Sequence, residues 1–386
     1  MITPENRTSA IHAKGPAQGN GSARFKKFVL TAHLYLGLVS AIFLLTLGVS
    51  GAVMAFEQEI PRWLHADVWY VPAESQKVPE AELIGNVERR YAPARVISVH
   101  ISRSPRLVQV MVIAVPGKGR GTVPPRRAFV NPYTGAVLGT LPLHTTDEQI
   151  LQTIHNIHLR IGMGDAGKLI VSMAGLVLCF EVVFGLILWL RLKRTKVKWS
   201  GSRFRVYFDL HHVVGIYALA CLLLMGLTGV AIGFEDFFMS SLIYSVTNSA
   251  PMPRHPPPNS TPIAGANPIS IDQAMAIARQ ALPGTTVAQI QLPSSPRACY
   301  ALGMRIPEET APAVMSQVDV DQYSGRVLWD WDLRTSLGRR VIRFNRSIHT
   351  GDVLGFPGHI LVSLFSLSLV FMVATGVMIW WRKLAI

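Results

Sequence analysis

Cysteine is scarce in this chain, with three residues in a sequence of 386. Cys179 and Cys221 stand within apolar blocks and Cys299 stands outside them, so the sequence has neither a CxxC pair nor a cysteine-rich framework. We therefore expect no disulfide and no cysteine-based redox centre.

Negative charge is also in short supply, because 23 Asp and Glu residues face 37 Lys and Arg residues and the formal net charge is +14. A basic protein often binds nucleic acid, but no basic stripe here alternates with base-stacking aromatic residues in a soluble domain. The basic residues instead flank apolar blocks. The sequence thus predicts a lipid bilayer as the partner and no nucleic acid.

Hydrophobic residues make up 49% of the chain and are gathered in long blocks. Four blocks are long enough to cross a bilayer of about 30 Å at roughly 20 residues each. We expect transmembrane helices over 28–56, 167–191, 209–234 and 358–381. No cleavage pattern precedes the first block, which is too long for a signal peptide, so it is interpreted as a retained helix.

The positions of Lys and Arg predict the orientation of these helices. Basic residues are concentrated before the first block, between the second and third blocks, and after the fourth. The tail 1–27, the loop 192–208 and the C-terminus 382–386 are therefore expected in the cytoplasm. The long segments 57–166 and 235–357 are then expected on the outer side.

Internal similarity indicates that the chain consists of two copies of one unit. A shift of 178 residues aligns the first block with the third, and a shift of 191 aligns the second with the fourth. The aligned pairs include His33 with His211, Gly51 with Gly229, Glu57 with Glu235, His158 with His349 and Gly185 with Gly376. The duplicated unit is interpreted as helix, outer domain, helix.

Each outer segment has the pattern of an α+β domain. Residues 81–96 and 270–287 each suggest an amphipathic helix, and strand-like runs follow both. The tripeptides YTG and YSG then predict turns between strands. The expected fold is a four-helix transmembrane bundle built from the duplicated unit, with two α+β domains on the outer side.

Four histidines occupy equivalent positions in the two units. His33 and His211 stand at the cytoplasmic ends of the first and third helices, and His158 and His349 stand just outside the second and fourth. Haem iron takes two axial nitrogen donors, and two helices of a bundle can supply one each. The sequence predicts one bis-histidine pair near each membrane face and two haem b groups, since no CxxCH segment exists for covalent attachment.

Several alternatives stay open at this point. A single haem or purely structural histidines would also fit, and His155 or His212 could replace the neighbouring ligand. Arg160 and Arg346, next to the outer histidines, are candidates for contact with haem propionates. Glu181 lies in the middle of an apolar block, where it could tune a haem, carry a proton, or bond a neighbouring hydroxyl.

Two segments carry a family resemblance: AHLYLG and LHHVVG at the entrances of two helices, and the turns NPYTGAVL and DQYSGRVL. With the helix-then-strands pattern, they resemble the PepSY-associated transmembrane proteins, over nearly all of residues 24–383. The chain is most similar within that group to bacterial inner-membrane ferrisiderophore reductases. The resemblance implies periplasmic PepSY-like domains, an inner-membrane location, and an oxidoreductase that reduces Fe(III) in a ferric siderophore to Fe(II).

The electron donor is not identified by the sequence. No GxGxxG segment follows a predicted strand, and the cytoplasmic loops are too short for a flavin or nicotinamide domain. The donor is therefore expected to be another protein or a membrane quinol. Two other functions stay possible: a membrane-anchored PepSY-type protein that binds peptides or inhibits peptidases, and a transporter of an iron chelate.

Overall fold

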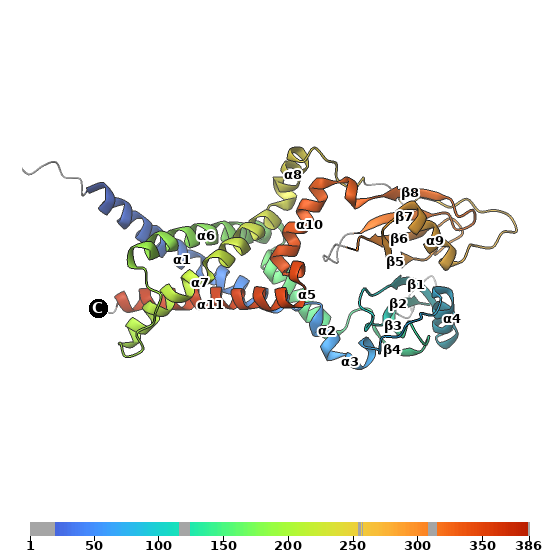
Figure 1. Cartoon of the computed structure of the whole chain (residues 1–386), viewed down its shortest axis with the longest axis horizontal. Helices are drawn as coiled ribbons and strands as arrows, with labels where there is room; N and C mark the ends of the chain where they lie inside the picture. The colour runs from blue at the N-terminus through green and yellow to red at the C-terminus, as the bar shows by residue number, and fades with distance from the viewer. Residues whose placement is uncertain (1–19, 116–123, 254–255, 257, 308–314, 385–386) are drawn as a thin grey trace, which may run out of the picture.

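The structure of the chain is a computed structural model that describes residues 20–115, 124–253, 256, 258–307 and 315–384. A bundle of long helices forms one end of the molecule and a β-sheet forms the other (Figure 1). The expected cytoplasmic tail lies outside the described residues up to residue 19, as do the last two residues of the C-terminus.

Four long helices confirm the four expected membrane spans, since each has a stretch long and apolar enough to cross a bilayer. They are α1 (Asn20–Met54), α6 (Gly164–Leu192), α7 (Arg203–Gly233) and α11 (Phe356–Leu384). Helices α1 and α7 begin before the expected positions 28 and 209. For α7 the reason is an N-cap, because the Ser202 side chain accepts a hydrogen bond from the Arg205 backbone N–H.

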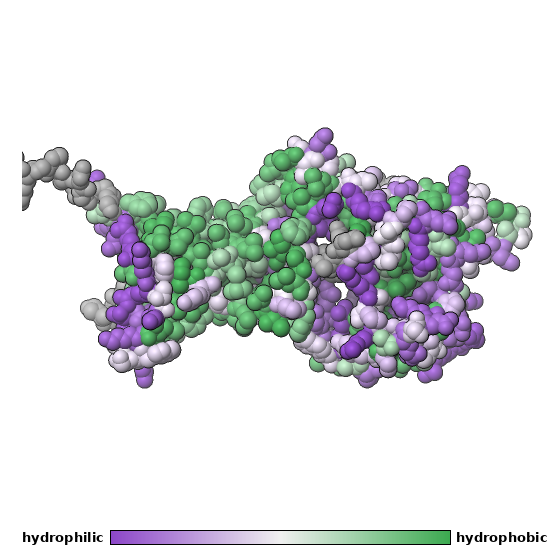
Figure 2. All heavy atoms as spheres, viewed as in Figure 1, coloured by the Kyte–Doolittle hydropathy of each residue, from purple (hydrophilic) through white to green (hydrophobic). Residues whose placement is uncertain are grey.

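The surface of the helical bundle is apolar, and polar residues gather at its two ends (Figure 2). Large apolar side chains point outward from different helices, among them Val39 at 74% exposure, Leu227 at 55% and Leu364 at 56%. Water would penalise such a continuous apolar surface, whereas lipid tails match it. The chain is therefore a membrane protein.

Helices α1 and α7 lie at opposite corners of the bundle, because each packs against both α6 and α11. Glycines allow this close packing: a Cβ atom added at Gly48 would lie 2.8 Å from Val370 Cγ2, and one added at Gly226 would lie 2.8 Å from Cys179 Sγ. A small core of Leu and Ala side chains fills the centre.

Short helices connect the bundle to the sheet. In the first half these are α2 (Glu59–Leu64), α3 (Ala66–Trp69) and α5 (Thr146–Arg160). In the second half they are η1 (Glu235–Met239), α8 (Ser240–Val246), η2 (Leu333–Thr335), α10 (Leu337–Thr350) and η3 (Asp352–Leu354). Helix α5 packs against α1 and α6, and α10 packs against α7 and α11. These two helices therefore reach back from the sheet to the bundle.

The sheet has eight antiparallel strands in the order β4-β3-β2-β1-β5-β6-β7-β8. Its strands are β1 (Arg95–His100), β2 (Gln109–Ala114), β3 (Arg126–Val130), β4 (Val137–Pro142), β5 (Thr286–Gln291), β6 (Tyr300–Arg305), β7 (Ser316–Val320) and β8 (Val327–Trp331). The helices α4 (Glu80–Arg90) and α9 (Ile271–Ala281) are amphipathic. These elements confirm the helices and strands expected from the sequence.

The two expected outer domains are joined into one sheet. Strand β1 pairs with β5, with Val99 opposite Ile290. Leu83 of α4 and Ala274 of α9 belong to one buried cluster that also includes residues of both four-stranded halves. The physical reason is that β1 and β5 would each present an unpaired edge, and their pairing satisfies both edges. Residues far apart in the sequence thus share one hydrophobic core.

The turns expected at YTG and YSG connect β3 with β4 and β7 with β8. Gly135 and Gly325 adopt φ values of +71° and +70°, which an L side chain would disfavour. Asn131 and Asp321 each accept a hydrogen bond from the backbone N–H two residues later, at 2.8 and 2.9 Å. The two halves therefore use the same turn chemistry.

Candidate functional site

His33 of α1 and His211 of α7 form a pair inside the bundle, and their ring centres lie 6.4 Å apart. They come from the two helices at opposite corners, so their side chains meet across the bundle centre. The structure thus brings together two of the four predicted ligands.

His158 and His349 form a second pair, with ring centres also 6.4 Å apart. They lie on α5 and α10, outside the membrane-spanning helices as expected. Their rings nevertheless contact the last turns of α1 and α7, at Ser50 and Thr228. Although α5 and α10 lie outside the spanning helices, the rings of the second pair therefore reach in between the ends of α1 and α7.

The Nδ1 atoms of three of these histidines contact a hydroxyl from a spanning helix. Ser50 Oγ lies 2.9 Å from His158, Thr228 Oγ1 2.9 Å from His349 and Thr375 Oγ1 2.9 Å from His211. Each hydroxyl donates its hydrogen to the backbone carbonyl four residues earlier, at 2.6 to 2.8 Å. The hydroxyl oxygen must then accept from the ring, which fixes the tautomer with hydrogen on Nδ1.

His33 differs, because its Nδ1 faces a carboxylate: Glu181 Oε2 lies 2.7 Å away. The two atoms are within ion-pair distance, but the ring N–H is not aligned for a hydrogen bond. Two lone pairs would repel at this distance, so His33 also carries its hydrogen on Nδ1. In the part of the chain that the structure describes, no hydrogen bond reaches Nε2 of any of the four histidines.

The rings of the second pair are neutral at physiological pH. Burial, with a smaller contribution from His349, lowers the pKa of His158 to about 3. Burial lowers the pKa of His349 to about 4, and Arg346 adds to the effect. A neutral imidazole with hydrogen on Nδ1 presents a free lone pair on Nε2, which is the form that binds a metal ion.

A glycine lies against each of the four rings. A Cβ atom added at Gly51 or Gly229 would lie 3.2 Å from Cε1 of His158 or His349, and one added at Gly185 or Gly376 would lie 3.6 Å from Cε1 of His33 or His211. The two closer contacts leave no room for a side chain without a shift of the ring. These glycines therefore form part of the surface against which each histidine ring packs.

The donor set fits haem. A metal–imidazole bond is about 2 Å long and the ring centre lies about 1 Å beyond the nitrogen, so two axial imidazoles place their centres roughly 6 Å apart. Both pairs have ring centres at 6.4 Å. Among the described residues no three His, Cys, Asp or Glu side chains cluster as a metal site. Two donors per site suit a haem better than a bare ion.

The two alternative ligands have other contacts. His155 Nδ1 lies 3.0 and 3.1 Å from the two carboxylate oxygens of Glu57. His212 Nδ1 donates to the backbone carbonyl of Phe208 at 2.8 Å, on its own helix. The histidine rings that face each other across the two halves are His33 with His211 and His158 with His349, so the geometry favours His158 and His211.

The two candidate propionate partners are both in ion pairs. Arg160 contacts Asp165 at 2.9 Å, and Arg346 contacts Glu235 at 2.9 Å. Both side chains are partly exposed, at 39% and 46%. A guanidinium has five N–H donors, so each arginine keeps donors for a further acceptor.

Sequence reasoning missed the hydroxyl partners of the histidines. Ser50 and Thr228 are separated by the same 178 residues as His33 and His211, so the repeat contained a signal for them. Thr375 has Phe184 at its repeat position, so the repeat contained no signal for it.

The partners of His359 were also missed. Its ring lies between the carboxylates of Glu59 and Asp352, at 3.0 and 3.1 Å.

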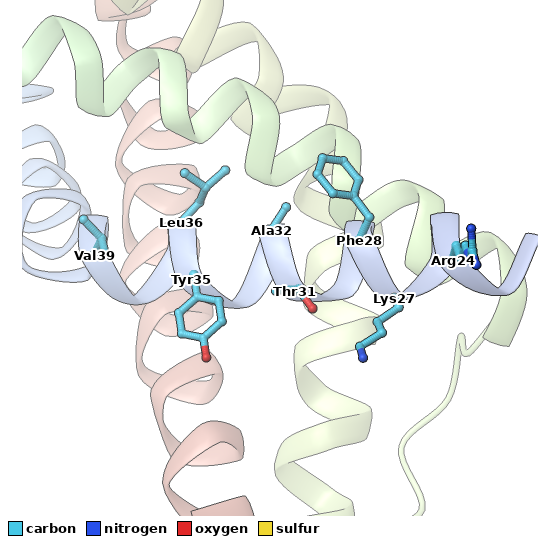
Figure 3. A pocket seen from close by; sticks show the side chains of 8 residues that line it. All are labelled: Arg24, Lys27, Phe28, Thr31, Ala32, Tyr35, Leu36 and Val39. Carbon is cyan, nitrogen blue, oxygen red and sulfur yellow. The ribbon is translucent and has the colours of Figure 1, made fainter. Parts of the chain in front are cut away.

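An open apolar groove runs along the first half of α1 (Figure 3). Its lining residues are Arg24, Lys27, Phe28, Thr31, Ala32, Tyr35, Leu36 and Val39. The basic side chains lie at one end of the groove, and apolar side chains follow toward the bundle (Figure 3). None of the four paired histidines lines it, so the groove is separate from the two sites.

One family comparison bears on this geometry. The family model described as the PepSY-associated TM region matches residues 30–383. The matched range contains all four paired histidines and the whole sheet. A search of the curated proteins finds no match.

Proposed function

This chain belongs to the PepSY-associated TM region family, and from that premise we propose that it is a di-haem ferric-siderophore reductase of the bacterial inner membrane. Electrons enter from a cytoplasmic protein or a quinol and leave to a periplasmic ferric siderophore. The chain is a duplicated unit with both termini in the cytoplasm and both PepSY-like halves of the sheet in the periplasm.

The observation that supports this proposal is the arrangement of four histidines in two similar pairs. In each pair the ring centres are 6.4 Å apart and both Nδ1 atoms are held by a partner from a spanning helix. Such partners orient axial ligands and set which nitrogen is free. A purely structural histidine needs only one contact and has no reason to face a second ring at ligand spacing.

The two pairs lie at different depths of the bundle. Ser50, which holds His158, follows His33 by seventeen residues on α1, and a rise of 1.5 Å per residue places them about 25 Å apart. A haem supplies reversible one-electron chemistry at each pair when bound. The chain keeps the two sites in line across the bilayer.

The substrate is the ferric ion of a siderophore, which takes one electron and becomes Fe(II). Fe(II) is held more weakly by hard oxygen chelators, so reduction releases the iron. Arg160 and Arg346 border the periplasmic pair and keep free N–H donors, which suits haem propionates or an anionic chelate. Close approach to the haem edge is enough, so no residue needs to bind the iron itself.

The haem content of the purified protein tests the proposal. A pyridine haemochrome assay is expected to give two haem b groups per chain. His33→Ala or His211→Ala should remove the haem on the cytoplasmic side, called the inner haem. His158→Ala or His349→Ala should remove the haem on the periplasmic side, called the outer haem. His144→Ala is the matched control, because His144 is an exposed residue of a loop. A colourless wild-type protein would contradict the redox function and favour an anchored peptide-binding module.

The acceptor is tested separately. Dithionite-reduced protein is mixed anaerobically with a ferric siderophore in the presence of ferrozine, which reports Fe(II). Haem reoxidation should accompany Fe(II) formation and should slow in the His349→Ala protein. Haems that stay reduced with every ferric chelate but reoxidise with another acceptor would rule out the siderophore and leave electron transfer standing.

A further inference from the structure

The four histidines differ in the group that holds Nδ1. His158, His349 and His211 have a hydroxyl, whereas His33 has the carboxylate of Glu181. The position equivalent to Glu181 in the second half is Met372. The asymmetry therefore concerns one histidine alone, because the other three have the same kind of partner.

Glu181 occupies a space that the second half fills with an apolar group. A Cβ atom added at Gly37 would lie 3.3 Å from Glu181 Oε2, and one added at the equivalent Gly215 would lie 3.0 Å from Met372 Cε. Both glycines leave room for a long side chain from the facing helix. In the first half this side chain carries a carboxylate to the ring of His33.

The carboxylate has few other contacts. Its side chain is 12% exposed, and its Oε1 atom is buried without a hydrogen-bond partner. Within the described ranges, His33 is the one ion-pair partner of Glu181. A carboxylate in an apolar helix is costly unless something nearby favours negative charge. A cationic iron centre bound to His33 would do so.

We propose that Glu181 is a positioning residue that lowers the reduction potential of the inner haem below that of the outer haem. This inference rests on the proposed function. A carboxylate 2.7 Å from Nδ1 places negative charge against the ring, which makes the imidazole a better electron donor than a hydroxyl partner does. A stronger donor and a nearby negative charge both favour the more positive Fe(III) state.

The consequence is a direction for electron flow. With haem held by both histidine pairs, one electron would pass from the inner site to the outer site, so the inner site would be oxidised by one electron and the outer site reduced by one. The cytoplasmic or quinol donor then restores the inner site. A lower inner potential makes this transfer downhill toward the sheet side, where the acceptor is proposed to bind.

Potentiometric titration of the two haems in Glu181→Gln protein tests the inference. Gln keeps the size of the side chain and removes its charge. We expect the ferric preference of the inner haem to fall about tenfold, which for a one-electron couple raises its potential by about 59 mV. His33→Ala protein is expected to keep the outer haem alone, so its titration curve shows which of the two redox transitions belongs to the outer haem.

The matched control is Glu57→Gln, which neutralises a carboxylate that contacts a histidine at the other end of α1. This variant should leave the inner potential unchanged. Two bound haems with an unshifted inner potential in Glu181→Gln protein would overturn the role of Glu181 and leave the proposed function intact. Absence of haem from the wild-type protein would instead contradict the proposed function.

A second measurement needs no variant and applies even if Glu181→Gln protein loses its inner haem. The near-infrared magnetic circular dichroism band of oxidised wild-type protein reports the donor strength of the axial imidazoles. We expect two bands, with the inner one displaced toward stronger imidazole donation. Two coincident bands would show equivalent ligands and would contradict the proposal.

Discussion

At the scale of single residues, the tautomers of His158, His211 and His349 are each set by a hydroxyl whose own hydrogen is already donated to a backbone carbonyl. Ser50 Oγ donates to the Thr46 carbonyl at 2.6 Å, so only its lone pairs face His158. Thr228 and Thr375 repeat this arrangement. Helical backbone carbonyls thereby decide which nitrogen of a histidine on another helix keeps a free lone pair.

Ser50→Ala should weaken the outer haem site. The substitution leaves Nδ1 of His158 without its acceptor, so the ring loses the contact that orients it. Loss of such a partner typically costs about 10- to 100-fold in metal affinity. Haem titration of apoprotein should show the weaker site. Thr46→Val is the control, because Thr46 bonds within its own helix and lies on the exposed side. Equal haem affinity in both variants would contradict the role of Ser50.

Gly51→Ala should disturb the same site by a different route. The added Cβ would lie 3.2 Å from both His158 Cε1 and Ser366 Oγ, so the ring or the neighbouring helix must shift. We expect haem content to fall from two toward one per chain, with the inner haem retained. Gly85→Ala offers a comparison, since a Cβ at this helical position would meet only the flexible end of the Arg89 side chain. Full haem content in Gly51→Ala protein would show that the ring tolerates the displacement.

At the scale of elements, the turn between β7 and β8 depends on a buried carboxylate. Burial by itself would raise the pKa of Asp321, but the backbone N–H groups of Ser324, Tyr323 and Thr261 outweigh it and lower the pKa. Asp321 is 3% exposed. It therefore fixes both its own turn and a distant loop segment at residue 261.

Asp321→Asn should destabilise the sheet in a pH-dependent way. The pKa of Asp321 is lower in the folded state than its ordinary value of 3.8, so its contribution is full above that value and is lost as the pH falls below it. Losing the charge-assisted bonds should cost about 2 kcal/mol at pH 7. Thermal unfolding should show that the difference in the free energy of unfolding between wild-type and Asp321→Asn protein becomes smaller below pH 4. A difference that stays constant down to pH 3 would contradict the role given to the Asp321 charge.

At the scale of the whole molecule, pairing of β1 with β5 makes one sheet from segments nearly 200 residues apart in the chain. The central strands therefore lose their edges, and the new edges are β4 and β8. Both halves of the sheet are tied to the bundle through α5 and α10, which carry His158 and His349. The sheet thus fixes the spacing of the two helices that bring these histidines together.

Amide hydrogen exchange should follow this order of strands. We expect the amides of β1 and β5 to exchange more slowly than those of β4 and β8, because the central strands open only with the whole sheet. Mass-spectrometric exchange on detergent-solubilised protein measures this difference. Rapid exchange in β1 and β5 together with slow exchange in β2 and β6 would show that the junction opens and the halves behave as separate domains.

Reporter fusions should reveal the orientation of the molecule in the membrane. A fusion after residue 198 lies in the basic loop between α6 and α7 and should report the cytoplasm. A fusion after residue 300, at the start of β6, should report the periplasm. The opposite pattern would reverse the proposed direction of electron transfer while leaving the two histidine pairs in place.

The sequence by itself determined the features that depend on local composition. Apolar blocks long enough to cross a bilayer predicted the four spans. Alternating patterns bounded by turn residues predicted the strands. The repeat spacing singled out His33, His211, His158 and His349. The spans and strands are confirmed because length and periodicity depend on local sequence, whereas the role of the four histidines as haem ligands stays a prediction.

The tertiary structure alone decided which separate segments meet. The β1–β5 junction joins two edges that each half could have left exposed. Thr375 and Glu181 reach their histidines from neighbouring helices, and no sequence spacing links them to His211 or His33. The physical reason is that helix rotation and sheet register follow from packing across the whole bundle, which local pattern does not encode.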